Sequence, residues 1–491
     1  MPTAVHRISS NPYVATLRNN TMTSIQTPVA QGQQQTVDLV LAAGAVITVD
    51  PSRQIILGGA VAVAGAKIVA VGKRADVLAQ FTPARLIDRP NGILTPGLVD
   101  SHSHPAGAYL IRGTIDELPA IERLTRTLMP HEDDLRPDEA YVASMATFAE
   151  MIRHGTTTFI DAGGPQTEQT AAAAAAIGIR GVLAPQMSDL PGPFERKVLS
   201  ASENLAHADE LFARFDGAAD GRLKVFYDLD HPLSVTDELL AGVVEHARAN
   251  NTGIVGHYIG RKPLGEIPEH APDLARYERS GILDHGIVLG HLGWIPEADV
   301  QRLAASASSV AHCPSSSMLG AHGNISKGAI PEFVAAGGLT TLGTDGAAIS
   351  RFLDLVRVMY LAAATHKDVR TDPSIMPATT VFEMATINGA KAARWEDTIG
   401  SIEVGKAADL VMFDASGLTF APNRFADPVN DLVYASSGSD VETVLIDGRV
   451  VMDEGKLLSV DLPALVADVD AAAASSLGRL GREQKPSWPI V

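Results

Sequence analysis

Residues 92–105 read G-I-L-T-P-G-L-V-D-S-H-S-H-P. An apolar run typical of a buried strand ends in two histidines that stand two positions apart, His102 and His104. Because side chains alternate between the two faces of a strand, positions i and i+2 point the same way. We therefore expect the two imidazoles to aim at one point, as the ligands of a metal ion do. The rest of the chain has to supply the remaining ligands.

The segments that follow this stretch alternate between strand-like and helix-like patterns. Further strand candidates cover residues 157–163, 181–185, 223–230, 253–258, 286–292, 309–314 and 340–345, and helical patterns such as 238–249 and 330–337 lie between several of them. Near-continuous apolar strands that alternate with helices predict a parallel sheet covered on its faces. About eight strands over roughly 300 residues favour an α/β fold of the (β/α)8 TIM-like barrel type. A doubly wound open sheet is the alternative.

The two ends of the chain differ from the middle. Residues 1–36 are polar and predict a loose extension. Residues 37–93 read as short strands, and so does the start of residues 397–491, whose last part is expected to be a tail. Neither end is large enough to form a comfortable core alone. We therefore expect one small β-sandwich domain built from both ends, with residues 94–396 inserted as the barrel.

Composition narrows the class of function. The chain has 491 residues and a formal net charge of −18, which argues against nucleic acid and against anionic membranes as partners. No span of about 18 residues is uniformly apolar, so no membrane helix is expected. The single cysteine, Cys313, permits no intrachain disulfide, which fits a cytoplasmic protein. We expect a small-molecule substrate and, on general grounds, a homo-oligomer.

Polar residues that bind metals recur at the predicted strand ends. In a (β/α)8 barrel the chemistry lies at the C-terminal ends of the strands. These ends carry His102, His104, His257, His291, His312 and Asp345. Histidine and carboxylate suit zinc, iron and similar divalent ions, and a catalytic site keeps one position open for water. A lone buried histidine is more often a core residue than a metal ligand. The prediction of a metal site therefore depends on the placement of several such residues at the ends of different strands.

Three motifs resemble one known family. P-G-L-V-D-S-H-S-H resembles the opening metal motif of the amidohydrolase superfamily, while H-C-P-S-S-S-M and L-G-T-D-G are similar to its strand-seven and strand-eight signatures. The details resemble the branch that contains cytosine deaminase, thiomethyladenosine deaminase and the triazine hydrolases. The likeness covers nearly everything after residue 37.

The resemblance implies a ligand set and roles. By it, one divalent metal ion per chain is held by His102, His104, His257 and Asp345. The ion expected is zinc, with iron, cobalt or manganese as alternatives. Asp345 is also the general base, and His291 acts in catalysis or contacts the substrate. Binuclear members of the superfamily bridge two metals from the end of strand four, whereas Lys224 lies at the beginning of that strand, which favours one metal.

The chain departs from the branch in two places. Deaminases of the branch usually carry His-x-x-Glu after strand five, where the glutamate protonates a ring nitrogen; here Gly260 stands at that position in H-Y-I-G. After strand seven, His322 stands where a serine is usual, and we predict that it contacts the substrate. Further substrate contacts predicted from position alone are Tyr109, Tyr258, Trp294 and Ser316.

The missing glutamate bears on the reaction. An amine that leaves an aromatic ring requires early protonation of a ring nitrogen, whereas Asp345 and His291 suffice for an amide-like carbonyl. The sequence therefore favours an amidohydrolase that cleaves an amide, urea or carbamate C–N bond, not a peptide bond, in a small cyclic or aromatic molecule. The alternative is a deaminase or dechlorinase of a purine, pyrimidine or triazine ring. An inactive scaffold would show gaps in the ligand set, and none of its four positions is missing.

Overall fold

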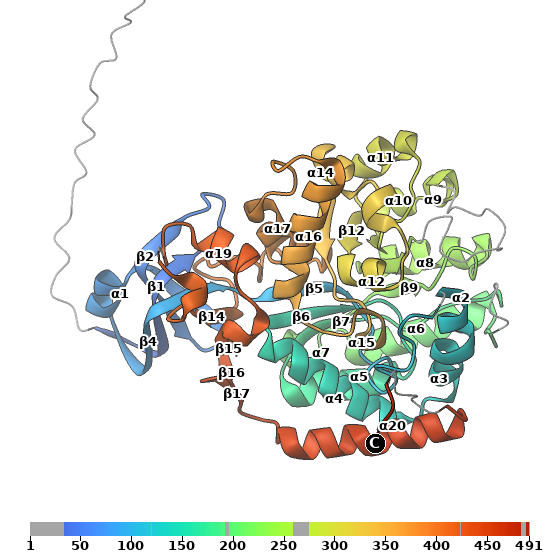
Figure 1. Ribbon diagram of the computed structural model, residues 1–491, viewed down its shortest axis with the longest axis horizontal. Coiled ribbons are helices and arrows are strands. Elements are labelled where there is room, and N and C mark those ends of the chain that lie inside the picture. The colour runs from blue at the N-terminus through green and yellow to red at the C-terminus, as the bar shows by residue number, and fades with distance from the viewer. Residues whose placement is uncertain are drawn as a thin grey trace, which may run out of the picture.

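The computed structural model describes residues 34–118, 120–191, 196–258, 274–422, 424–482 and 488–490. Two parts are visible in Figure 1: a mixed sheet on one side and, beside it, a larger part in which helices surround parallel strands. The prediction of an α/β fold with parallel strands is confirmed.

Strands from both chain ends share one eight-stranded sheet, ordered β17-β16-β15-β14-β4-β1-β2-β3. Its first four strands in the sequence are β1 (Gln35–Ile47), β2 (Ile55–Ala64), β3 (Lys67–Lys73) and β4 (Phe81–Pro96). The last four are β14 (Leu410–Asp414), β15 (Val441–Ile446), β16 (Arg449–Asp453) and β17 (Lys456–Leu457). The two sets meet where β14 pairs antiparallel with β4, with Met412 opposite Leu94.

The middle of the chain forms two parallel sheets. One has the order β5-β6-β7-β8, with β5 (Leu98–Ser103), β6 (Thr156–Asp161), β7 (Arg180–Leu183) and β8 (Leu223–Val225). The other has the order β13-β12-β11-β10-β9, with β9 (Tyr227–Leu229), β10 (Ile254–His257), β11 (Val288–Gly290), β12 (Ser309–His312) and β13 (Leu339–Leu342). The segment 223–230, predicted as one strand, is thus divided at Phe226 into β8 and β9.

Helices follow the strands as the alternating pattern predicts. The longer ones are α4 (Pro137–Arg153), α5 (Thr167–Ile177), α6 (Ala201–Phe215), α8 (Asp237–Ala249), α11 (Glu297–Ala304) and α16 (Leu355–Arg370), with the shorter α14 (Ile330–Ala335) and α17 (Ala378–Met384). Helix α8 shows why they form. The Thr236 hydroxyl caps it by accepting from the Leu239 N–H at 3.1 Å, and its leucines and valines at helical spacing are buried.

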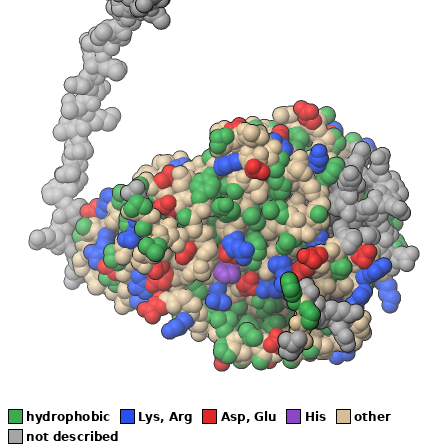
Figure 2. Space-filling model, viewed as in Figure 1, with side chains coloured by type: hydrophobic (Ala, Val, Ile, Leu, Met, Phe, Trp, Pro, Cys, Tyr) green, Lys and Arg blue, Asp and Glu red, His purple; other side chains and the backbone are tan. Residues whose placement is uncertain are grey.

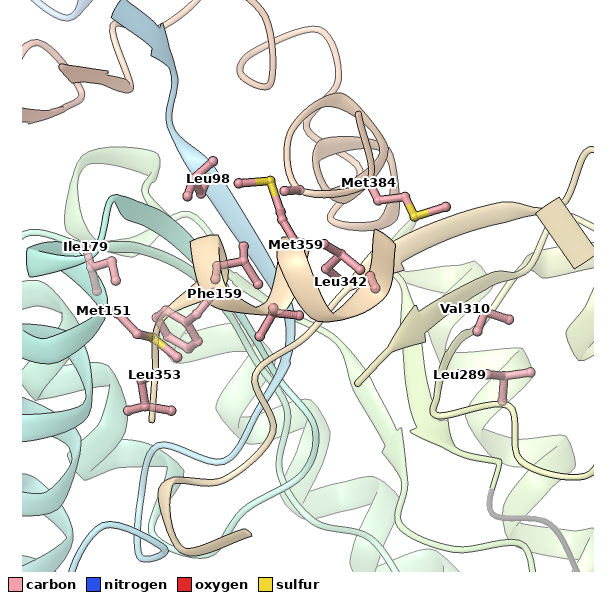
Figure 3. Packing of buried hydrophobic residues seen from close by; sticks show 14 of the residues in the cluster. Leu98, Met151, Phe159, Ile179, Leu289, Val310, Leu342, Leu353, Met359 and Met384 are labelled. Atoms are coloured by element: carbon pink, nitrogen blue, oxygen red, sulfur yellow. The ribbon is translucent and has the colours of Figure 1, made fainter. Parts of the chain in front are cut away.

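The main core lies between the parallel strands and these helices. Figure 3 shows Leu98 of β5, Phe159 of β6 and Leu342 of β13 among side chains of the surrounding helices, such as Met359 of α16. All four side chains are fully buried. Apolar packing of this kind holds the strands in place, so that the residues at their ends have fixed positions.

The C-terminal region differs from the expected tail. Residues Leu462–Arg479 form helix α20, which lies along α4 at the lower edge of Figure 1. Asp461 caps it by accepting from the Ala464 N–H, and Arg479 pairs with the buried Glu139 of α4 at 2.6 Å. A run of alanines after a capping aspartate favours a helix locally, whereas the ion pair with α4 is a long-range contact.

On the face shown in Figure 2, Lys and Arg side chains are interspersed with Asp, Glu and hydrophobic ones. Within the described ranges, no helix is long and apolar enough to cross a membrane.

Candidate active site

Four imidazoles and one carboxylate gather at the C-terminal ends of the parallel strands. The ring centroid of His102 lies 5.2 Å from that of His104, 4.9 Å from that of His257 and 4.7 Å from that of His291. Asp345 follows β13, and its Oδ1 lies 3.7 Å from His104 Nε2 while its Oδ2 lies 3.8 Å from His291 Nε2. The structure thus brings together five of the six residues that the sequence predicted to meet, and His312 is the exception.

Backbone carbonyls orient two of these rings. Nδ1 of His104 lies 3.2 Å from the Gly163 carbonyl oxygen, and Nδ1 of His257 lies 2.7 Å from that of Asp230. When Nδ1–H donates to a carbonyl, the lone pair of the ring resides on Nε2. One nitrogen from each of His102, His104 and His257 lies within 4.8 Å of the others. Nε2 of His102 is buried and has no hydrogen-bond partner among the described residues, an arrangement that a bound cation would explain.

The electrostatics also suit a cation. Burial lowers the pKa of His102 well below its usual value, and the neighbouring histidines lower it further. Burial lowers the pKa of His291 to about 3, although Asp345 opposes the shift. Burial alone would raise the pKa of Asp345, but His291 and His104 outweigh it and hold the value below the ordinary one. At neutral pH the site therefore offers neutral imidazoles from His102, His257 and His291 and a charged carboxylate, which are donors that divalent transition metals accept.

Asp345 is held firmly in an uncommon conformation. Its φ is +64°, a left-handed value that non-glycine residues rarely adopt. Its N–H donates to the His102 carbonyl at 2.8 Å, and its Oδ1 accepts from the Gly346 N–H at 2.6 Å. Buried Asp100 within β5 accepts from the N–H of Thr344, which lies just after β13, at 3.0 Å and so ties the two strands together. Strained residues fixed by their surroundings in this way are concentrated at functional sites.

A cavity opens over the cluster. Its apolar lining comprises Ala108, Leu124, Leu128, Met129 and Ile349, and its polar lining comprises His104, Arg123, Glu132, Gln186, Arg196, Asp230, His231, His257, His291, His322 and Asp345. Part of this wall comes from a π-helical turn, Leu124–Leu128, which lies between the short helices α2 (Ala120–Arg123) and α3 (Met129–Asp134). π-Helical turns are rare and often occur at functional sites.

Two acids form a polar side of the cavity. Glu132 pairs with Arg196 at 3.2 Å, and Asp230 accepts from the Gln186 side chain at 3.2 Å. Burial raises the pKa of Glu132 even though Arg196 opposes the shift. Sequence reasoning missed these residues. Asp230 is the last residue of the predicted strand 223–230 and could have been found by the strand-end rule, whereas Arg123 and Glu132 lie on helical turns with no signal in their spacing.

Some of the predicted substrate contacts line the cavity in the structure, and others do not. His322 lines the cavity, while Tyr109, Tyr258, Trp294 and Ser316 are not among the described residues that line it. The Tyr109 hydroxyl donates to Glu150 at 2.8 Å, and the Trp294 ring N–H donates to the His322 carbonyl at 2.9 Å. Tyr258 and Ser316 are buried. Gly260 lies outside the described residues.

Two further residues from the sequence analysis lie apart from the cluster. Nε2 of His312 is 3.0 Å from Nε2 of His366 on α16, so this ring bonds to a second histidine. Lys224 donates from Nζ to the Arg394 carbonyl at 2.5 Å, near the start of β8. It is therefore directed away from the strand end at which a bridging ligand would lie.

Comparisons with known proteins agree with this geometry. Residues 93–451 match the model of the amidohydrolase family. A 5-methylthioadenosine/S-adenosylhomocysteine deaminase of Pelotomaculum thermopropionicum is 32% identical over 447 residues, which are 90% of this chain and 99% of that protein. A 5'-deoxyadenosine deaminase of Methanosarcina acetivorans is 30% identical, with 90% and 99% covered. The crystal structure of an adenosine deaminase from Xanthomonas campestris with bound zinc superimposes with a TM-score of 0.82 at 29% identity, covering 91% of this chain and all of that one.

The fold, the site and these similarities define a metal-dependent hydrolase that acts on carbon–nitrogen bonds. The chain belongs to the amidohydrolase family, as its motifs predicted. Membership implies a TIM-barrel fold for the part that contains the parallel strands.

Proposed function

We propose that the protein is a zinc-dependent aminohydrolase that removes an amino group from a heteroaromatic ring of the aminopurine type. The observation that carries the proposal is the convergence of His102, His104, His257 and Asp345 at a cavity that has both apolar and polar lining residues. Two relatives that match this chain over nearly their whole length are named 5-methylthioadenosine/S-adenosylhomocysteine deaminase and 5'-deoxyadenosine deaminase. The apolar lining residues suit a flat ring, and the polar ones suit its substituents.

In this proposal the four converging residues hold one divalent ion. Three imidazole nitrogens and a carboxylate are a set that zinc accepts, and the similar adenosine deaminase structure contains zinc. When bound, the ion supplies a water that is acidic enough to react at neutral pH. His104 and His257 are held for this task by the carbonyls of Gly163 and Asp230, which fix their rings.

The protein groups then move protons and orient the substrate. Asp345 takes the proton from water as general base, since its lowered pKa keeps it ionised at neutral pH. His291, with Nε2 at 3.8 Å from the Asp345 carboxylate, orients the substrate carbon for attack. The C–O bond forms first, as the ring nitrogen accepts a proton, and the C–N bond breaks afterwards. Asp345 passes the proton that it took from water to the leaving nitrogen, and the hydroxyl proton that is lost as the carbonyl forms replaces the proton given to the ring nitrogen. The amine and water become a ring carbonyl and ammonia.

The ring nitrogen has to be protonated by a group other than residue 260, which is glycine. We assign this role to Glu132, whose carboxyl lines the cavity and whose raised pKa lets it keep a proton at higher pH than an ordinary glutamate. Arg196, paired with it, balances the charge that remains after transfer.

Hydrolysis of an amide, urea or carbamate C–N bond is the second candidate. The observation that favours it is the H-Y-I-G sequence after β10, which lacks the usual acid. An amide-like carbonyl does not require ring protonation, so Asp345 and His291 would suffice for it.

Product analysis on the zinc-loaded protein separates the two candidates. The panel pairs adenosine-type and other aminated heteroaromatics with anilides, ureas and carbamates. Deamination releases ammonia from the ring amines. Release of an organic amine from the second group, with no ammonia from the first, would establish the second candidate instead.

We further propose that the two parallel sheets close into one (β/α)8 barrel and that the eight-stranded sheet is part of a small β-sandwich domain. The hydrogen bond from the N–H of Thr344, just after β13, to Asp100 within β5 supports closure. A cytoplasmic location is proposed on the grounds that the only cysteine, Cys313, is a buried free thiol.

A further inference from the structure

We propose that Arg123, together with His322, is a specificity-determining site that binds an anionic group, such as a carboxylate, on the substrate. The inference rests on the proposed function, because it concerns the molecule that enters the same cavity.

Arg123 is a buried charge that forms no ion pair with any of the residues that the structure describes. Its residue is 4% exposed, it lines the cavity, and its Nη2 has no hydrogen-bond partner among the described residues. Asp345 and Asp116 attract it, but no ion pair within 4.0 Å joins it to a described residue, and Asp116 instead pairs with Arg351 at 3.0 Å. A buried guanidinium left in this state is costly, whereas an anion in the cavity would compensate for its charge.

The second arginine of the cavity provides a contrast. Arg196 is also largely buried, yet it pairs with Glu132 at 3.2 Å and with Asp133 at 2.8 Å. Its charge is therefore balanced within the protein. Of the two arginines that line the described cavity, Arg123 is the one with a buried donor, Nη2, that has no partner among the described residues.

Gly320 leaves the space that the side chains of Arg123 and His322 occupy together. Its φ of −80° is open to any residue, so the backbone does not require glycine. A Cβ at this position, however, would lie 2.2 Å from His322 Nε2 and 2.7 Å from Arg123 Nη2. Glycine thus lets the ends of both side chains approach one point beside the cavity.

His322 is fixed beside Arg123 by its loop. Its carbonyl accepts from the Trp294 ring N–H at 2.9 Å, and its N–H donates to the Ser317 carbonyl at 2.9 Å. Burial and the nearby Arg123 lower the pKa of His322 to about 4, so the ring is neutral at pH 7. A neutral imidazole can donate one hydrogen bond to an anion without adding a second charge.

These observations select the chemistry of the ligand. A neutral substrate would leave the Arg123 guanidinium unpaired, while a carboxylate accepts from a guanidinium through two oxygens. The substrate expected is therefore a ring amine that carries an acidic group as well as the amino group that leaves.

Binding of a small aromatic anion tests the site without any need for turnover. Calorimetry on the zinc-loaded protein compares benzoate with benzamide, its neutral counterpart. The wild type should bind benzoate at least about tenfold more tightly than benzamide, and Arg123→Met should remove this preference. Arg126→Met is the matched control, since Arg126 is three residues further along, exposed and paired with Glu122 at 3.1 Å. It should leave both affinities unchanged.

If Arg123→Met does not fold, a second variant still tests the proposal. Gly320→Ala adds one methyl group between Arg123 and His322 and should weaken benzoate binding several-fold, with benzamide unaffected. Equal benzoate affinity in the wild type and in Arg123→Met would overturn the inference, because the anion would then be bound elsewhere, for instance by the metal. So would a wild type that does not bind benzoate. Ammonia release without a preference for benzoate would refute this site and leave the proposed function standing. A preference for benzoate without ammonia release would support this site and refute the proposed function.

Discussion

The two ends of the parallel strands are both polar, but in different ways. At the C-terminal ends, His102 Nε2 and His291 Nδ1 are buried without hydrogen-bond partners in the described part of the chain. At the opposite ends, Arg180 forms two hydrogen bonds with Asp409, at 2.7 and 3.1 Å, and Lys224 donates to the Arg394 carbonyl. Buried groups that satisfy each other stabilise a fold, whereas buried groups left open await a ligand. The comparison therefore separates the reactive end of the strands from the structural end.

The largest effect should follow from a change at the reactive end. Asp345→Asn removes the general base and one charge of the metal site, so kcat should fall by about 10²–10⁴-fold. The fold should persist, because a strand-end side chain contributes little to the core. Steady-state kinetics with circular dichroism and metal analysis measure this. Full turnover in the variant would mean that the site has been assigned to the wrong residues.

A change at the structural end should show the opposite pattern. Arg180→Met leaves the carboxylate of Asp409, which is almost completely buried, without its partner. The free energy of unfolding should fall by about 3–5 kcal/mol, while kcat per folded, zinc-loaded chain stays within twofold. Denaturant titration and kinetics on the same sample provide both numbers. A loss of kcat without a loss of stability would contradict the assignment of a structural role to this end of the strands.

A substitution in the cavity wall should have an intermediate effect on activity. Glu132→Gln removes the proposed proton donor but keeps its size, so kcat/KM for a ring amine should fall by about 10–100-fold with metal content unchanged. The activity that remains should lose the decline that the wild type shows as pH rises through the pKa of Glu132, because glutamine does not titrate. An unchanged pH profile would assign the proton donor to another residue.

The smallest effect concerns Lys224 at the structural end. Burial lowers its pKa from 10.5 to about 8. Between these pH values the folded protein has released a proton that the unfolded chain keeps, so stability should rise with pH in this window. Relative to Lys224→Met, the wild type should gain about 1–3 kcal/mol between pH 8 and pH 10.5. A difference that is constant with pH would show that the ammonium is not destabilised by burial.

The comparison also explains what could be predicted from the sequence. The meeting of His102, His104, His257, His291 and Asp345 was predictable because strand alternation and strand ends define positions in space from a short stretch of chain. The same rule also included His312, which lies apart, and the choice of four ligands came from the resemblance to the family. The apolar strands and the helices at 238–249 and 330–337 were predictable from their periodicity in the same way.

The cavity wall was not predictable by such rules. Arg123, Glu132 and Arg196 approach the site from helices and a loop far apart in the sequence, and only the tertiary packing brings them together. Helix α20 was expected as a tail because its exposed, alanine-rich sequence lacks a clear apolar face, and its ion pair with α4 is a long-range contact. Phe226, which divides one predicted strand into β8 and β9, had no local signal either.

The measurement that tests the central claim most directly combines metal content with ammonia release on one preparation. The account predicts one zinc ion per chain, ammonia released from a ring amine, loss of that activity on chelation and its return with added zinc. Ammonia release that persists after the metal has been removed, or a stoichiometry of two metals per chain, would contradict it.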